Sequence, residues 1–278
     1  MNKILPDIQE TEPKIKIPIK QVGVENITLP FLLETKNRSF NQLTARVLMT
    51  TDLESDVKGI SMSRLLLTLK DYLDLPLKHK LIKEILQQLQ KNIGSKNSYM
   101  KFNFLLPRNK QSVLSEYSFP LYYDCSFEGN LIGEDIFRFF QTVKIQYSSY
   151  CPCSAELCKS LENGGFPHAQ RSFATIMIET IEPNYVWLED IIDSVELSIK
   201  TLPYPIIKRI DEQEIARIAG ENPLFVEDAI REISLKLNER DDICDWGVKC
   251  SHEESIHTSE AIAINYKGVE NGINSKYF

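Results

Sequence analysis

The stretch VGVENITLPFLLETKNRSFNQLTARVLMTTDL, residues 22–53, decides the fold expected for this chain. It holds two runs of β-branched or alternating residues, Val22–Glu34 and Asn41–Leu53, separated by a short polar segment. Apolar residues that alternate with polar ones between turn-forming residues are typical of β-strands. The stretch therefore predicts two neighbouring strands that form a hairpin.

Two helices and two more strands are expected after this hairpin. Helical spacing of apolar residues covers Leu65–Leu75 and resumes from Leu81 to the neighbourhood of Gly94. Strand-like composition returns in Tyr99–Leu106 and Ser112–Phe127, with the turn Pro107–Lys110 between them. The first half is therefore predicted to have the element order ββααββ.

The second half has a similar expected order. Its predicted strands are Phe139–Tyr150, Arg171–Thr180 and, as a single strand, Trp246–Tyr266. Its predicted helices are Trp187–Val195, Ile210–Ile218 and Val226–Leu237. The expected class is α+β, two tandem ββααββ-like units whose antiparallel sheets carry helices on one face. The expected boundaries are a tail at 1–18, a first unit at 19–130 and a second unit at 131–278. Open sheet edges favour pairing with another subunit.

Composition narrows the classes of function. The chain has 278 residues, of which 42% are hydrophobic and 26% charged, and no apolar run approaches the ~20 residues of a membrane span. The N-terminus lacks the apolar core of a secretory signal, so a cytoplasmic protein is expected. A net charge of −7 argues against a nucleic-acid surface. Six cysteines in such a chain indicate reactive or metal-bound thiols more than disulfides.

A Cys-rich segment is the first candidate site. Cys151-Pro152-Cys153-Ser154 lies at the end of a predicted strand, and His168 follows a segment that contains Gly164 and Gly165. A thiolate and an imidazole brought together by a Gly-rich loop suit a borderline-soft metal such as zinc. The structural alternative is buried cysteines used for packing and a loop histidine without a role.

The second candidate cluster is Ser251–His257. In the predicted last strand, alternation puts Glu254 and His257 on opposite faces unless a β-bulge turns them toward one another. The alternative interpretation is a polar strand edge or a surface loop, where acidic residues and histidines are common.

The third region joins the charged run Lys208–Glu212 to a later helix start. Asn222 is the predicted N-cap of that helix, with Pro223 at its first position. Glu227 and Asp228 then lie near the first turn, where negative charge suits the helix dipole without any catalytic role. Composition cannot separate this structural role from a functional one.

Taken together and in order, five motifs resemble GTP cyclohydrolase type IB, the prokaryotic form of GTP cyclohydrolase I. They are Cys151-Pro152-Cys153-Ser154, His168-Ala169-Gln170-Arg171-Ser172, Lys208-Arg209-Ile210-Asp211-Glu212, Asn222-Pro223 with Phe225-Val226-Glu227-Asp228, and Glu254-Ser255-Ile256-His257. Lys58–Arg64 resembles a further segment of that family. The resemblance implies a tunnelling fold and a homotetramer with active sites at subunit interfaces.

The resemblance also implies a reaction and a set of residues. The family hydrolyses GTP to 7,8-dihydroneopterin triphosphate and formate, the first step toward folate and, in many bacteria, toward queuosine-type deazapurines. It uses zinc, manganese or another divalent ion such as iron. The implied roles are metal ligation by Cys151, His168 and Glu212, with Cys153 as an alternative thiolate; catalysis by Cys153, Glu254 and His257; guanine binding by Glu227; and triphosphate binding by Lys208, Arg209 and Arg171.

This sequence departs from the family pattern at three positions. Ser61 and Ser259 stand where the family has histidines, and Ala155 stands where it has lysine. Two alternative functions therefore stay open. One is another tunnelling-fold enzyme that acts on a pterin or purine. The other is a non-catalytic oligomeric binding protein of the same fold.

Overall fold

The computed structural model describes residue 9 and residues 11–181 and 183–278. Residues 1–8 and 10 of the expected tail, 1–18, lie outside the described residues. The chain divides into two compact units. One comprises the residues up to Phe104 together with Ser126–Phe140, and the other comprises Leu105–Cys125 with Gln141–Phe278. No helix among the described residues is long and apolar enough to cross a membrane.

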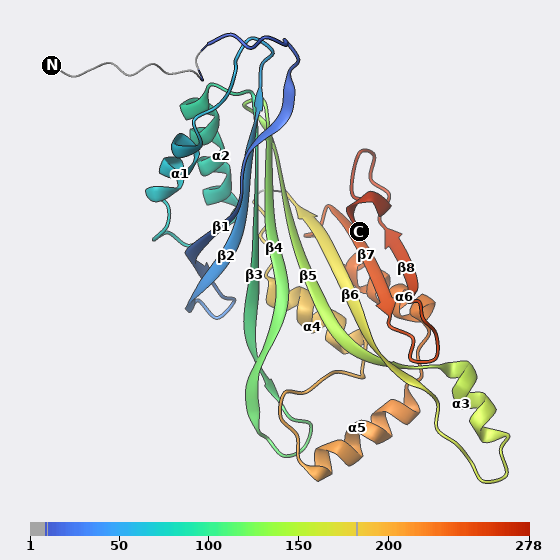
Figure 1. Ribbon diagram of the computed structural model, residues 1–278. Coiled ribbons are helices and arrows are strands. Elements are labelled where there is room, and N and C mark those ends of the chain that lie inside the picture. Colours follow the sequence, from blue (N-terminus) through green and yellow to red (C-terminus); the bar gives the residue numbers. More distant parts are fainter. Residues whose placement is uncertain (1–8, 10, 182) are drawn as a thin grey trace. The chain divides into compact units, whose positions relative to one another are not determined.

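The first six elements have the predicted order ββααββ (Figure 1). They are β1 (Ile19–Glu34), β2 (Phe40–Leu53), α1 (Met62–Lys70), α2 (His79–Ile93), β3 (Asn97–Gln111) and β4 (Ser118–Ile132). β1 and β2 form the expected antiparallel hairpin, with Phe31 opposite Leu43. The hairpin has a register shift between Val24 and Ile27, where Asn26 adopts a φ of 59°.

The remaining elements repeat this order with additional helices. They are β5 (Ile136–Tyr150), α3 (Pro152–Lys159), β6 (Ala169–Thr180), α4 (Leu188–Ser198), α5 (Arg209–Glu221), α6 (Val226–Asn238), β7 (Asp245–His252), β8 (Ala261–Tyr266) and a 3₁₀ turn at Ser275–Tyr277. The eight strands follow one another in chain order in one sheet. The predicted α+β class with antiparallel strands is confirmed.

The core of the first unit lies between its strands and the α1–α2 pair. Alternate strand residues are buried, among them Phe31, Val47 and Phe102. The buried residues of α2, among them Ile82 and Leu86, recur at helical spacing along one face of the helix. Gly129 lets that helix approach β4, since a Cβ atom there would lie 2.3 Å from an Ile82 methyl carbon. Burial of these apolar side chains stabilises the unit at about 1.5–3 kcal/mol each.

The turn predicted at Pro107–Lys110 is wrong. β3 continues through these residues to Gln111, and the chain reverses at residues 112–117, where Ser112 N–H donates to the Tyr117 carbonyl at 2.7 Å. The polar residues of Pro107–Lys110 do not mark a turn. Lys110 pairs with Glu196 of α4, so its charge has a partner within the fold and does not mark a loop.

The single strand predicted for Trp246–Tyr266 is also wrong. The structure has two strands, β7 and β8, paired from His252 opposite Ala261 onward. Residues 253–260 form the connection, and the Glu254 N–H donates to the His252 carbonyl at 2.9 Å. Glu254 and His257 therefore lie in a turn, where strand alternation places no constraint on their directions.

Candidate functional site

One pocket of the second unit collects most of the candidate residues. Its volume is about 490 Å³. It is lined by Cys151, Cys153, Ser154, Leu157, His168, Gln170, Leu224, Phe225, Val226, Glu227, His252, Glu254, Ile256, His257 and Ala261. These residues come from the ends of β5 and β7, from the starts of β6, α6 and β8, from α3, and from the connection between β7 and β8. Six of the ten expected site residues are thus brought together.

The N-terminus of α3 positions the cysteines. Cys151 is the N-cap residue, and its Sγ accepts a hydrogen bond from the Ser154 N–H at 3.4 Å. Pro152 occupies the first turn, where its missing N–H costs no helical hydrogen bond. The cap position therefore fixes the Cys151 sulfur at the start of α3, where it faces the pocket. Cys153 lies in the same turn and is exposed.

Gln170 connects His168 to Glu254. The His168 Nδ1 atom lies 3.1 Å from the Gln170 Oε1 atom, and the Gln170 Nε2 atom donates to a Glu254 carboxylate oxygen at 3.2 Å. The second Glu254 oxygen lies 3.6 Å from His168 Nδ1. These contacts hold an imidazole and a carboxylate of the pocket in a fixed arrangement.

The connection between α5 and α6 brings Glu227 to the pocket. The predicted N-cap role of Asn222 is wrong, because Asn222 ends α5 and its Nδ2 atom donates to the Ile218 carbonyl at 2.7 Å. The chain then runs extended, and the Leu224 N–H donates to the Tyr150 carbonyl at 3.0 Å. Phe225 is the N-cap residue of α6. Glu227 lies in the first turn, as expected, and its exposed side chain lines the pocket.

Four expected site residues lie outside this pocket. Lys208, Arg209 and Glu212 are exposed at the start of α5. Glu212 lies ten positions before Asn222, about 15 Å along a helix, and the pocket lining begins only at Leu224, beyond the end of α5. Arg171 follows Gln170 on β6, so strand alternation directs its exposed side chain to the other face.

Asp211 anchors the start of α5. Its carboxylate accepts hydrogen bonds from the backbone N–H groups of Leu114, Ser115 and Lys208 and from the Ser115 hydroxyl. Burial raises the pKa of Asp211, but these hydrogen bonds outweigh burial and hold that pKa well below its usual range. The acid next to Glu212 therefore ties α5 to the β3–β4 turn.

Two of the three expected metal ligands share the pocket. Cys151 offers a sulfur atom, and the Gln170 contact at Nδ1 of His168 leaves the Nε2 atom of that ring available. Sulfur and imidazole nitrogen together form a donor pair suited to zinc. Glu212 does not join them. Among the described residues, no group of three or more His, Cys, Asp or Glu is arranged to hold a metal ion. The pocket therefore fits two of the donors of such a site.

Sequence reasoning missed Gln170 and His252. Gln170 stands inside a motif quoted above and has a usable signal, whereas His252 stands in the Ser251–His257 cluster and its surroundings are seen only in the structure. Gln170 lies two residues after His168 at the start of a strand, so alternation directs the two side chains to one face. His252 is 2% exposed, accepts or donates to the Tyr147 hydroxyl at 2.9 Å, and contacts the Ser149 hydroxyl at 3.1 Å.

His252 predicts a loss of stability in mild acid. Burial lowers the pKa of His252 to about 4, and the opposing effect of the Glu227 carboxylate is smaller. An unfolded histidine ionises near pH 6.5, so the folded state binds fewer protons below that pH. The stability is fully present above about pH 6.5, and about 3 kcal/mol is expected to be lost as the pH falls to about 4.

Urea unfolding at pH 7, 5.5 and 4.5 measures this loss. His252→Gln removes the titrating group, so its free energy of unfolding is expected to fall less steeply with pH, whatever its value at pH 7. His257→Gln, at an exposed position, serves as the matched control and keeps the wild-type slope. An unchanged slope in His252→Gln contradicts the assignment.

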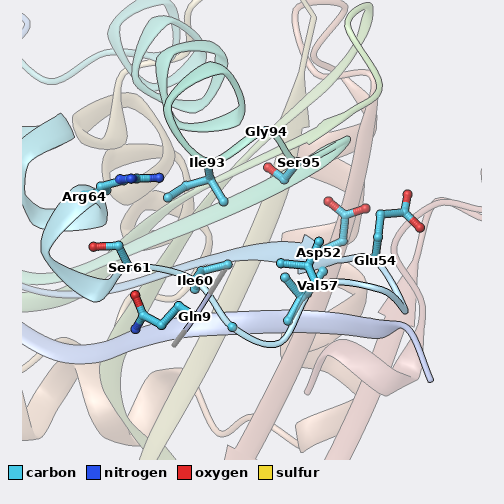
Figure 2. Close-up of a pocket in the computed structure, with 12 residues that line it drawn as sticks. Gln9, Asp52, Glu54, Val57, Ile60, Ser61, Arg64, Ile93, Gly94 and Ser95 are labelled. Atoms are coloured by element: carbon cyan, nitrogen blue, oxygen red, sulfur yellow. The ribbon is translucent and has the colours of Figure 1, made fainter. Parts of the chain in front are cut away.

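A second pocket, in the first unit, contains the Lys58–Arg64 segment. It has a volume of about 240 Å³, and Ser61, Arg64, Asp52 and Ser95 are among its lining residues (Figure 2). Ser61 is the N-cap residue of α1 but makes no side-chain capping hydrogen bond. Asp52 accepts hydrogen bonds from the backbone N–H groups of Lys96 and Asn97. Among the described residues, this pocket of the first unit shares no lining residue with the pocket that contains Cys151 and His168.

Solved structures share the architecture. The crystal structure of uricase from Arthrobacter globiformis matches with a TM-score of 0.57 and 5% sequence identity, covering 95% of this chain and 99% of that one. A uricase from Bacillus fastidious matches with a TM-score of 0.50 and 8% identity, covering 88% and 92%. At this identity the likeness concerns the fold alone, and it confirms the expected tunnelling fold.

Sequence relatives are much closer. The GTP cyclohydrolase FolE2 of Geobacter metallireducens is 35% identical over 259 residues, covering 93% of this chain and 95% of that protein. The GTP cyclohydrolase FolE2 of Cereibacter sphaeroides is 32% identical over 273 residues, covering 95% and 76%. The family described as type I GTP cyclohydrolase folE2 matches residues 5–263. With this match over most of its length, the chain belongs to the type I GTP cyclohydrolase folE2 family.

Proposed function

We propose that this protein is a metal-dependent GTP cyclohydrolase I that converts GTP and water to 7,8-dihydroneopterin triphosphate and formate. The observation that carries the proposal is the pocket that joins Cys151, His168, Glu227, Glu254 and His257. The family to which the chain belongs, and the relatives named above, are GTP cyclohydrolases. The pocket supplies a soft donor pair, an acid for the guanine edge and two groups that transfer protons.

Each residue then has a chemical task. The Glu227 carboxylate accepts hydrogen bonds from the N–H groups of the guanine edge, a charge-assisted contact. A divalent ion, held by Cys151 and His168, supplies Lewis-acid activation of water when it is bound. Glu254 and His257 accept and return protons as water adds at C8 of the purine, the imidazole ring opens and formate leaves.

The proposed third metal donor and the proposed triphosphate contacts lie outside the pocket that contains Cys151 and His168. We keep Glu212 as the proposed third ligand. Because Asp211 anchors the start of α5 outside the pocket, Glu212 would reach Cys151 and His168 from another subunit. Among the described residues, those that line the pocket include neither Lys nor Arg, so basic groups must reach the triphosphate from elsewhere. Lys208, Arg209 and Arg171 remain the candidates, from this chain or from another subunit.

A homotetramer with sites at subunit interfaces accords with this need. β1 and β8 are the edge strands of the sheet, and unpaired edges favour association. Phe166, 96% exposed, and Ile256, 62% exposed, are apolar groups near the pocket that water would otherwise contact. Light scattering after size-exclusion chromatography tests the assembly, and a monomer at micromolar concentration would exclude it.

The activity is tested by incubating the reduced protein with GTP and manganese or zinc. Formate release and the fluorescence of the oxidised pterin are followed together. Formation of both, abolished by a chelator, is the expected result. A metal-loaded protein that leaves GTP intact would instead favour another pterin or purine substrate. A protein that takes up no metal would favour a binding role.

A further inference from the structure

Gln170 lies between two groups to which the proposed chemistry assigns different tasks. Its side chain is 7% exposed and lines the pocket. Its Oε1 atom is 3.1 Å from His168 Nδ1, and its Nε2 atom is 3.2 Å from a Glu254 oxygen. A buried amide that has one partner on each side is fully oriented, because its acceptor and its donors cannot exchange places.

The identity of the partners fixes the direction of each hydrogen bond. The amide nitrogen can only donate, so the Gln170 Nε2 atom donates to the Glu254 oxygen. The Gln170 Oε1 atom can only accept, so His168 carries its proton on Nδ1. The lone pair of His168 is therefore left on Nε2, the atom that remains for an external electron-pair acceptor.

We infer that Gln170 is a positioning residue that sets the ligating form of His168 and the orientation of Glu254 at the same time. This inference rests on the proposed function. Partners of this kind, beyond the atoms that touch a metal, orient the histidine and typically change metal affinity or activity by 10- to 100-fold when mutated. Only one Glu254 oxygen is held by the amide, and the other lies 3.6 Å from His168 Nδ1.

Two substitutions separate the two tasks. Gln170→Glu keeps an acceptor for His168 Nδ1 but replaces the donor toward Glu254 by a second carboxylate. Its metal affinity is expected to stay within about threefold of wild type or to increase, while kcat falls about 10- to 100-fold. Gln170→Met has a similar volume but neither hydrogen bond, so both the metal affinity and kcat are expected to fall about 10- to 100-fold.

The measurements are a metal titration of the apoprotein against a chromophoric chelator, and formate release at saturating GTP. Gln87→Glu makes the same substitution on the exposed face of α2 and is expected to change neither quantity. Thermal unfolding shows whether each variant is folded. If Gln170→Met does not fold, Gln170→Glu alone decides, because the split between affinity and kcat has no counterpart in a purely structural role.

The outcomes separate this inference from the proposed function. Wild-type turnover together with a Gln170→Glu variant that matches wild type in both quantities overturns the inference alone. Equal loss of metal affinity in both variants overturns it as well, because the retained acceptor would then have no effect. A wild-type protein that binds metal without releasing formate contradicts the proposed function, while the affinities still test the His168 contact. Absence of metal uptake by wild type overturns both.

Discussion

Cys151→Ala and His168→Ala are each expected to abolish metal binding and GTP turnover while the fold and the assembly persist. Both residues line the pocket, and Cys151 caps a short helix with no buried residues, so a change there disturbs little packing. Loss of a cap costs about 1 kcal/mol. Without the bound ion, the pKa of the attacking water is not lowered from its ordinary high value, so turnover is expected to fall by about 10⁴-fold or more.

Metal content by mass spectrometry and formate release measure this effect, and Cys153→Ala decides between the two candidate thiolates. If Cys151 is the ligand, Cys153→Ala keeps its metal. Cys158→Ala is the matched control, because Cys158 lies on the same helix but not among the pocket residues. Wild-type metal content in both Cys151→Ala and His168→Ala would refute the ligand pair.

Glu227→Gln is expected to lower kcat/KM for GTP by about 10³-fold. The carboxylate can accept from two guanine N–H groups at once, whereas an amide of the same shape offers one acceptor and turns a donor toward the base. Sites built to pair a substrate N–H discriminate by up to about 10⁴–10⁵-fold. The position in the first turn of α6 contributes less than about 1 kcal/mol to the helix.

Inosine triphosphate, which lacks the guanine amino group, gives the specific readout. Wild type is expected to prefer GTP strongly, and Glu227→Gln is expected to lose most of that preference. Asp228→Asn is the control, since Asp228 is in the same helical turn but forms a surface ion pair with Arg231 at 2.7 Å. A Glu227→Gln variant that keeps the wild-type preference would show that another group recognises the guanine.

Local periodicity was sufficient for the order of the first six elements, but not for α3 or for the division of the last predicted strand into β7 and β8. The β1–β2 hairpin, the two helices after it and the strand that ends at Tyr150 were all predicted, because alternation and 3.6-residue spacing are properties of neighbouring residues. The errors occurred where a distant partner changes the meaning of a polar residue. The ion pair of Lys110 turned an apparent loop into part of β3.

The candidate site shows the same division. The sequence by itself determined the family, the chemical types of the site residues and the placement of Glu227 in a first helical turn, since each depends on residue identity and short spacing. Only the tertiary structure decided which of them meet. Hydrogen bonds between distant segments join His168 to Glu254 through Gln170, and those of Asp211 tie the start of α5 to the β3–β4 turn, outside the pocket. Local patterns do not encode such contacts, because the partners are far apart in the sequence.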